Sequence, residues 1–432
     1  MNRREVWITG CGAVTAAGSG TPALEAALYA DRLLAAQEGD AAYPVARAPA
    51  MPASRQIRRL DRSARLFLAA ATEAWEDAGL PDYAPDPCRC AVIEGSSLGP
   101  MCELIEESER AAARNGAALQ GPARRGRPFD LVRFMTGAGG AFFAQERGVA
   151  GPVLHISCGS VSSASAIGEA AHWVASGRAD LVVVGGAENP LHPDVIELFR
   201  AAGILAFRDG APAACLPFDE RRCGTWLGEG AGVVVLESAE RAMARGRAPH
   251  AALLGYGMAC EPHSMTAPDP SGSGLVAAVR EALGTGLPDG SGLPDGSRLP
   301  DGSGLPDGSR LSASAAGIGW IKAHATGTQQ GDAAECRGLA AALGPMFEDL
   351  PITGLKPLLG HCLGASGAVE AVAAVLALRR GVIPATLGTE RIDPDLPACR
   401  VTTRAIPLEA PGALLLSESF GGRAAALVLR AA

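Results

Sequence analysis

Short apolar runs alternate with longer helical segments along the chain, and Gly-rich turns separate them. The short runs predict buried β-strands, because runs of this length between turn residues are typical of strands inside a covered sheet. They fall at 6–9, 90–93, 153–156, 181–184, 233–237, 318–323, 414–416 and 426–429. Helices are predicted at 63–79, 162–176, 275–283 and 367–380. The alternation indicates an α/β protein built in layers.

Two Gly/Ser-rich turns each open a helix of small residues. CGSVSSASAIGEAA begins at Cys158, and GHCLGASGAVEAVAA begins at Gly360. Their similarity predicts an internal duplication. One half, 1–245, carries the first turn, and the other, 246–432, carries the second. We expect the two turns to face each other across a pseudo-two-fold axis.

A low-complexity insert, 284–311, lies inside the second half. The unit LPDGS begins at four leucines spaced six residues apart: Leu287, Leu293, Leu299 and Leu305. Pro-Asp-Gly favours turns, and the repeat has no apolar alternation that could form a core. A hexapeptide β-helix is the structural alternative, but it needs more coils with regular inward apolar positions. We therefore predict a flexible surface loop.

The composition is that of a soluble protein of the reducing cytoplasm. Of the residues, 48% are hydrophobic and only 4% aromatic, so packing relies on small side chains. The eleven cysteines include no CxxC pair, which disfavours a disulfide framework. The net charge of −8 disfavours nucleic acid as a partner. No apolar run is long enough to span a membrane, and the N-terminal segment predicts a strand, not a signal peptide.

No bound cofactor or metal is expected. Gly10-Cys11-Gly12 follows the first strand, but the third glycine falls at Gly18, too far for a dinucleotide-binding turn. No acidic residue follows a second strand at the expected distance, and the Cys and His residues lack metal-ligand spacing.

The candidate chemistry lies in three loops. The segment from His155 to Ser160 runs from a strand through a tight turn into a helix, whose free N–H groups favour negative charge. His324 and His361 lie in Gly-rich loops of the second half. The only two lysines, Lys322 and Lys356, each lie within five residues of one of these histidines. A turn-borne nucleophile facing two histidines predicts an acyl-transfer site.

Several further motifs follow one another along the chain: VWITGCGAVTAAG, ADLVVVGGAE, PFDERRCGTWLGEGAG, KAHATGT, KPLLGHCLGASGAVEA and the terminal SFGG. In this order they resemble the β-ketoacyl-acyl carrier protein synthases and their chain-length-factor relatives. The resemblance implies a thiolase-like fold, a duplicated five-layered α-β-α-β-α architecture. It also implies that His324 and His361 polarise a malonyl thioester while CO₂ leaves, with Lys356 and Glu370 ordering the network.

The nucleophile position departs from the family pattern. Pro152 lies eight residues before Ser160, and Ile167 and Gly168 lie seven and eight after it, as they flank the catalytic cysteine in the family. Ser160 therefore occupies the cysteine position, and Cys158 is the less favoured alternative. A cysteine is largely thiolate at a helix N-terminus, whereas a serine hydroxyl needs a base in contact. We expect slow condensation, while decarboxylation could survive.

The C-terminal loop departs too. The family typically has Gly-Phe-Gly-Gly followed by Thr-Asn or Val-Asn, and this chain has Ser-Phe-Gly-Gly-Arg-Ala from Ser419. The resemblance implies that this loop gates the pocket and helps to form the oxyanion site, so both should be altered here.

Three functions remain open from the sequence. The chain is a condensing enzyme or acyltransferase of type II fatty-acid or polyketide synthesis that uses Ser160, a chain-length-factor-like subunit, or a malonyl decarboxylase. The resemblance implies acyl carrier protein as a partner, which presents substrates on its phosphopantetheine. It also implies a dimer, either a homodimer or a heterodimer with a cysteine-bearing ketosynthase.

Overall fold

The computed structural model of the protein describes residues 4–34, 36–37, 44–50, 57–115, 128–208, 210–284 and 317–432. Its main sheet has the strand order β16-β14-β13-β18-β19-β12-β1-β11-β7-β5-β6, with β2 paired to β1. Apart from Gly284, the LPDGS insert lies outside the described residues, so its predicted flexibility stays a prediction.

Two sets of five strands repeat one topology within this sheet. The first set is β1 (Val6–Thr15), β5 (Cys90–Gly95), β6 (Val153–Ile156), β7 (Leu181–Glu188) and β11 (Gly230–Ser238). The second is β12 (Ala251–Cys260), β13 (Ile318–Lys322), β14 (Pro351–Thr353), β18 (Gly412–Ser419) and β19 (Arg423–Ala431).

The pairing confirms the duplication. In the first set β5 lies parallel to β6 and β7, and β11 lies antiparallel to β7 and β1. In the second set β13 lies parallel to β14 and β18, and β19 lies antiparallel to β18 and β12. Residues 6–8 of β1 pair with residues 251–253 of β12 and join the sets. The exact boundary between the halves, expected at residue 245, stays a prediction.

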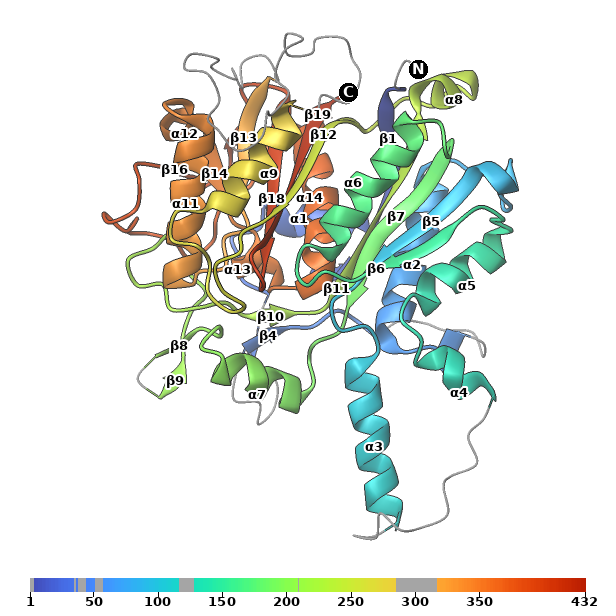
Figure 1. Cartoon of the computed structure of the whole chain (residues 1–432), viewed down its shortest axis with the longest axis horizontal. Coiled ribbons are helices and arrows are strands. Elements are labelled where there is room, and N and C mark those ends of the chain that lie inside the picture. Colours follow the sequence, from blue (N-terminus) through green and yellow to red (C-terminus); the bar gives the residue numbers. More distant parts are fainter. Residues whose placement is uncertain are drawn as a thin grey trace.

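Helices form three layers around the two sets of strands, which gives the expected five-layered α/β architecture (Figure 1). One outer layer holds α2 (Arg62–Asp77) and α5 (Ala138–Arg147), which pack on the first set. The other holds α9 (Ser273–Gly284) and α11 (Gln329–Leu343) beside the second set. Between the sets lie α6 (Ser162–Ala175) and α14 (Ser366–Arg380), which contact both.

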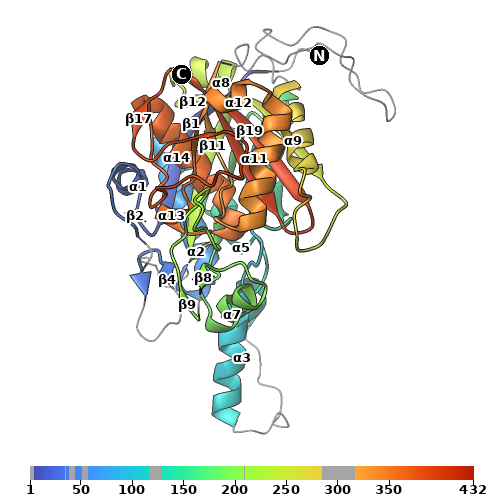
Figure 2. The ribbon, with the colours of Figure 1, turned by 90° about the vertical axis from the view of Figure 1, so that its left-hand side faces the viewer.

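The remaining elements lie around this framework, and α3 projects away from it (Figure 2). The helices are α1 (Thr21–Leu28), α3 (Met101–Asn115), α4 (Pro128–Arg133), α7 (Pro193–Ala201), α8 (Ala239–Ala244), α12 (Met346–Asp349) and α13 (Lys356–Leu359). The short strands are β2 (Gly18–Ser19), β3 (Ala36–Gln37), β4 (Pro44–Ala46), β8 (Phe207–Arg208), β9 (Ala211–Pro212), β10 (Leu227–Gly228), β15 (Val382–Ile383), β16 (Arg400–Val401) and β17 (Ile406–Pro407). Over the described residues, no helix is long and apolar enough to cross a membrane.

The small residues of α6 and α14 let the central layer pack at backbone distance. A Cβ added at Gly367 of α14 would lie 2.8 Å from the backbone nitrogen of Ala164 in α6. Residues 366–378 of α14 are all buried, so this helix is enclosed on every side. Because both helices begin at the same end of the layer, their N-terminal turns meet, and the candidate site lies there (Figure 1).

The first strand is longer than the pattern predicted. It was expected at 6–9, and the structure continues it to Thr15 through Gly10 and Gly12. The strand runs on through both glycines. Glycine stands at these positions because α2 crosses close above the strand and leaves no room for a side chain. A Cβ at Gly12 would lie 2.0 Å from the carbonyl oxygen of Ala70, closer than real Cβ contacts.

Replacing Gly12 with alanine should therefore destabilise the fold. The added methyl group must push α2 away from β1, and overpacking of this kind lowers the free energy of unfolding by about 1–3 kcal/mol. Urea unfolding of Gly12→Ala against the parent protein measures the change. An unchanged transition would show that α2 has room to move.

Candidate active site

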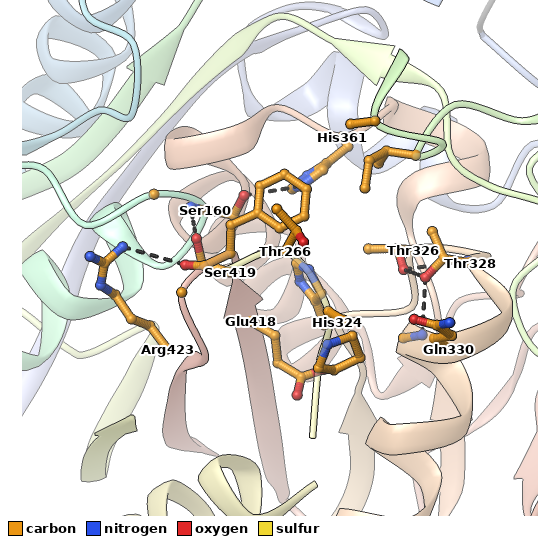
Figure 3. A pocket seen from close by; sticks show the side chains of 18 of the residues that line it. Ser160, Thr266, His324, Thr326, Thr328, Gln330, His361, Glu418, Ser419 and Arg423 are labelled. Carbon is orange, nitrogen blue, oxygen red and sulfur yellow. Dashed lines mark hydrogen bonds between the residues drawn. The ribbon is translucent and has the colours of Figure 1, made fainter. Parts of the chain in front are cut away.

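A cavity of about 680 Å³ lies where the two helix N-termini meet (Figure 3). Ser160, His324 and His361 line it, together with side chains from the β18–β19 turn. The structure thus brings together the predicted nucleophile of the first half and both predicted histidines of the second. Lys356 and Glu370 lie buried behind them.

Ser160 stands in the turn just before α6. Gly159 adopts φ +73°, a left-handed conformation that glycine tolerates without strain, and the turn then enters the helix. The Oγ of Ser160 lies 3.1 Å from Nε2 of His361. The less favoured candidate, Cys158, directs its Sγ towards Ser165 Oγ at 3.7 Å and is not among the cavity-lining residues.

The two imidazoles lie edge to face, with ring centroids 5.4 Å apart. His361 Nδ1 forms a 2.9 Å hydrogen bond with Ser366 Oγ, so Nε2 is the atom presented to Ser160. Burial, aided by the positive charge of Lys356, holds the pKa of both histidines well below 6.5. His361 is therefore neutral at neutral pH. With its proton on Nδ1, its Nε2 can accept the Ser160 proton.

Glu370 anchors a buried network behind the histidines. Its Oε1 accepts a 3.0 Å hydrogen bond from Lys356 Nζ, and its Oε2 contacts Lys322 Nζ. Lys356 Nζ also lies 3.3 Å from His324 Nδ1 and donates to the His324 carbonyl oxygen. Lys322 Nζ donates to Leu416 O at 2.7 Å, which ties the network to β18. Burial lowers the pKa of Lys322.

Glu335 of α11 holds the His324 loop from the other side. Its two carboxylate oxygens accept the backbone N–H groups of His324 at 2.5 Å and Ala325 at 2.8 Å. Ala325 has φ +49°, which is a strained conformation for a residue with a side chain. The carboxylate offsets this strain and holds the backbone from which the His324 side chain projects.

Sequence reasoning assigned no contact at the site to Glu335, Ser366 or Ser419, and it singled out Lys322 without assigning it a partner. The scarcity of lysine pointed to Lys322, but nothing in the spacing indicated that both lysines meet on Glu370. Ser366 lies five residues after His361 in the same turn, and this proximity was a usable signal. Glu335 and Ser419 reach the site only through the tertiary fold.

The β18–β19 turn reaches the nucleophile directly. The backbone N–H of Ser160 donates a 2.9 Å hydrogen bond to Ser419 Oγ (Figure 3). Gly421 and Gly422 follow with φ near +70°, and Phe420 between them and Ser419 is 42% exposed. Arg423 Nη1 donates to the Phe420 carbonyl oxygen at 3.4 Å. The altered Ser-Phe-Gly-Gly-Arg-Ala loop thus places a hydroxyl at the nucleophile's own N–H.

A duplicated α/β fold, with Ser160 and two histidines where its central helices begin and a buried lysine behind them, defines a protein of the thiolase-like fold. Profiles of the β-ketoacyl synthase N-terminal and C-terminal domains match residues 50–242 and 309–390. The chain belongs to the β-ketoacyl synthase family.

Relatives and solved structures agree with this assignment. A putative polyketide beta-ketoacyl synthase 1 of Streptomyces halstedii is 32% identical over 86% of this chain and 82% of its own length. The 3-oxoacyl-[acyl-carrier-protein] synthase 2 of Vibrio cholerae is 32% identical over 87% and 84%. A type II polyketide ketosynthase solved with its acyl carrier protein matches over the full length of both chains, with 25% identity and a TM-score of 0.85. The ishigamide ketosynthase/chain length factor matches equally fully, with 26% identity and a TM-score of 0.82.

Removing the shared carboxylate should destabilise the protein strongly. Glu370→Ala leaves two lysines buried without their counter-charge, and breaking a buried pair in this way lowers the free energy of unfolding by about 3–5 kcal/mol. Urea unfolding measures the change. Glu169→Ala on α6 is the control, because the Glu169 side chain is 48% exposed. Similar losses in both variants would contradict the role assigned to Glu370.

The low histidine pKa values predict a flat activity profile on the acid side of neutrality. An ordinary imidazole would gain a proton near pH 6.5 and lose its ability to act as a base. Burial pushes both pKa values well below 6.5. The single-turnover rate of a reaction that uses these imidazoles as bases should therefore not fall as the pH drops from 8 to 6. A sigmoidal loss with its midpoint near 6.5 would contradict neutral, buried histidines.

Proposed function

We propose that this chain accepts an acyl group on Ser160 from an acyl carrier protein and condenses it with a malonyl unit in fatty-acid or polyketide synthesis. The observation that carries the proposal is the 3.1 Å contact between Ser160 Oγ and His361 Nε2. A serine hydroxyl becomes a nucleophile only with a base in contact, and His361 is buried, neutral and correctly oriented.

The acylation step follows from this contact. Ser160 Oγ attacks the carbonyl carbon of the thioester while His361 Nε2 takes the hydroxyl proton. The C–S bond then breaks, and the proton passes from His361 to the departing phosphopantetheine thiol. The acyl group remains on Ser160 as an oxygen ester.

Condensation uses the histidines a second time. His324 and His361 donate to the carbonyl oxygen of the incoming malonyl thioester once each carries a proton on the nitrogen that faces the cavity. The carboxylate leaves as CO₂, and its electron pair forms the enolate. The enolate carbon attacks the ester carbonyl, and the C–O bond to Ser160 Oγ breaks. The Ser160 oxygen takes the Nε2 proton of His361, and His361 regains a proton at Nδ1 from solvent water, because condensation consumes one proton. Lys356 and Glu370 hold His324 in place throughout.

An oxygen ester is a poorer acyl donor than a thioester, so this condensation should be slow. Two other candidate functions draw support from the same geometry: malonyl decarboxylation without condensation, and a chain-length-factor-like subunit that condenses nothing itself. The N–H of Ser160 is engaged by Ser419 Oγ, which weakens acylation, whereas decarboxylation needs the histidines alone.

The edge strand β6 supports dimerisation in either case. Val153 and Leu154 are 38% and 43% exposed, although both are large and apolar. Unpaired edges with apolar side chains invite pairing with another chain. We propose that β6 pairs with a second copy or with a cysteine-bearing ketosynthase. Two solved structures that resemble this chain contain a ketosynthase together with a chain length factor.

Restoring the thiol should raise condensation. Ser160→Cys supplies a nucleophile that ionises near neutral pH and a thioester intermediate, so the condensation rate should increase roughly 10-fold or more. Ser160→Ala should abolish the acyl adduct, and Cys158→Ala should keep it. Intact-mass measurements after incubation with acyl-loaded and malonyl-loaded carrier protein follow adduct and product.

The same experiment separates the candidate functions. An acyl adduct that maps to Ser160 supports acyl transfer. Release of CO₂ without an adduct supports the decarboxylase, and activity only beside a cysteine-bearing partner supports the subunit. Full-length product from the isolated chain would contradict the subunit.

A further inference from the structure

Ser419 occupies the place where an oxyanion on Ser160 would form. Hydrogen-bond donors that stabilise the tetrahedral intermediate of acyl transfer lie about 2.7–3.1 Å from the oxyanion. The N–H of Ser160, beside the carbon that Oγ attacks, is such a donor. Its 2.9 Å bond to Ser419 Oγ places another oxygen at that distance.

The N-terminus of α6 strengthens the Ser160 N–H as a donor to a negatively charged oxygen. Ser160 directly precedes Val161, the N-cap residue of α6, so the positive end of the helix dipole favours negative charge close to the Ser160 N–H. Gly159 leaves room for one small group beside it. A Cβ at Gly159 would lie 2.0 Å from Ser419 Oγ, so the hydroxyl packs directly against that bare backbone.

The backbone of Ser419 is fixed by its strand, and only its side chain can rotate. Ser419 is the last residue of β18 and pairs with Arg423 across the tight turn to β19. The backbone therefore keeps Oγ near Ser160, and only rotation about χ1 to another staggered rotamer can remove it. The Ser419 hydroxyl does not engage these histidine nitrogens: His361 Nε2 faces Ser160 Oγ, and His324 Nδ1 faces Lys356 Nζ.

We propose that Ser419 is a specificity-determining residue: its hydroxyl fills the oxyanion position and shifts the site from acylation of Ser160 towards decarboxylation at the histidines. The inference rests on the proposed acyl chemistry of this site. Acylation proceeds only when Ser419 rotates away and yields the Ser160 N–H to the substrate oxygen.

The test compares Ser419→Gly and Ser419→Ala with the parent protein. An acyl thioester of N-acetylcysteamine serves as acyl donor, which removes any dependence on carrier-protein docking, and malonyl-loaded carrier protein reports CO₂ release. Intact mass follows the adduct on Ser160. The ratio of acylation to CO₂ release should rise roughly 5-fold in both variants, as expected for freeing one neutral hydrogen bond. Cys158→Ala, in the same turn, should keep the parent ratio.

The same change in a Ser160→Cys background keeps the test independent of serine reactivity. Faster acylation of Ser160→Cys/Ser419→Gly than of Ser160→Cys supports the inference, even where Ser160 itself never carries an adduct and the proposed function fails. An equal rate overturns it. A slower rate also overturns it, because Ser419 would then be donating its own proton to the oxyanion. Melting temperatures establish that all variants are folded.

Discussion

The site depends on one carboxylate shared by two buried ammonium groups. Glu370 lies on α14 in the central layer, while Lys322 ends β13 and Lys356 begins α13. A buried ion pair of this kind is weak support for stability, since desolvation offsets much of the attraction. In this site the ion pair matters because it positions the side chains around it. Lys356 contacts both Glu370 and His324, and the proposed condensation step needs the His324 imidazole in one place.

The duplication explains why this network can face a nucleophile at all. Each half ends a parallel strand at the same side of the central layer, and each then starts a small-residue helix there. Ser160 comes from the turn before α6, and His361 from the turn before α14. Close packing of Gly367 against Ala164 brings the two turns together. A side chain added at Gly367 would press on Ala164 and push the two turns apart.

Much of this arrangement could be predicted from the sequence, because the motifs are local. Flanking residues such as Pro152 and Ile167 placed Ser160, and the alternation of strands and helices gave the layers. The features that the sequence did not predict are set by tertiary contacts. Gly10 and Gly12 were taken to end a strand, yet they are glycines because α2 crosses there. The contacts of Lys322, Glu335 and Ser419 arise from strand register and helix docking, which leave no local pattern.

A serine at the centre of a site built for carbanion chemistry changes which half of that chemistry the protein favours. The hydroxyl depends on His361 as a base, and the same histidine must stabilise the enolate, so the two demands compete on one imidazole. A thiolate at a helix N-terminus avoids that competition because it needs no base in contact. Ser419 acts in the same direction, since it engages the N–H that acylation requires. In the proposed chemistry, two independent features therefore weaken acyl transfer at residue 160, while the contacts of the His324–Lys356–Glu370 network, which would serve decarboxylation, are all present.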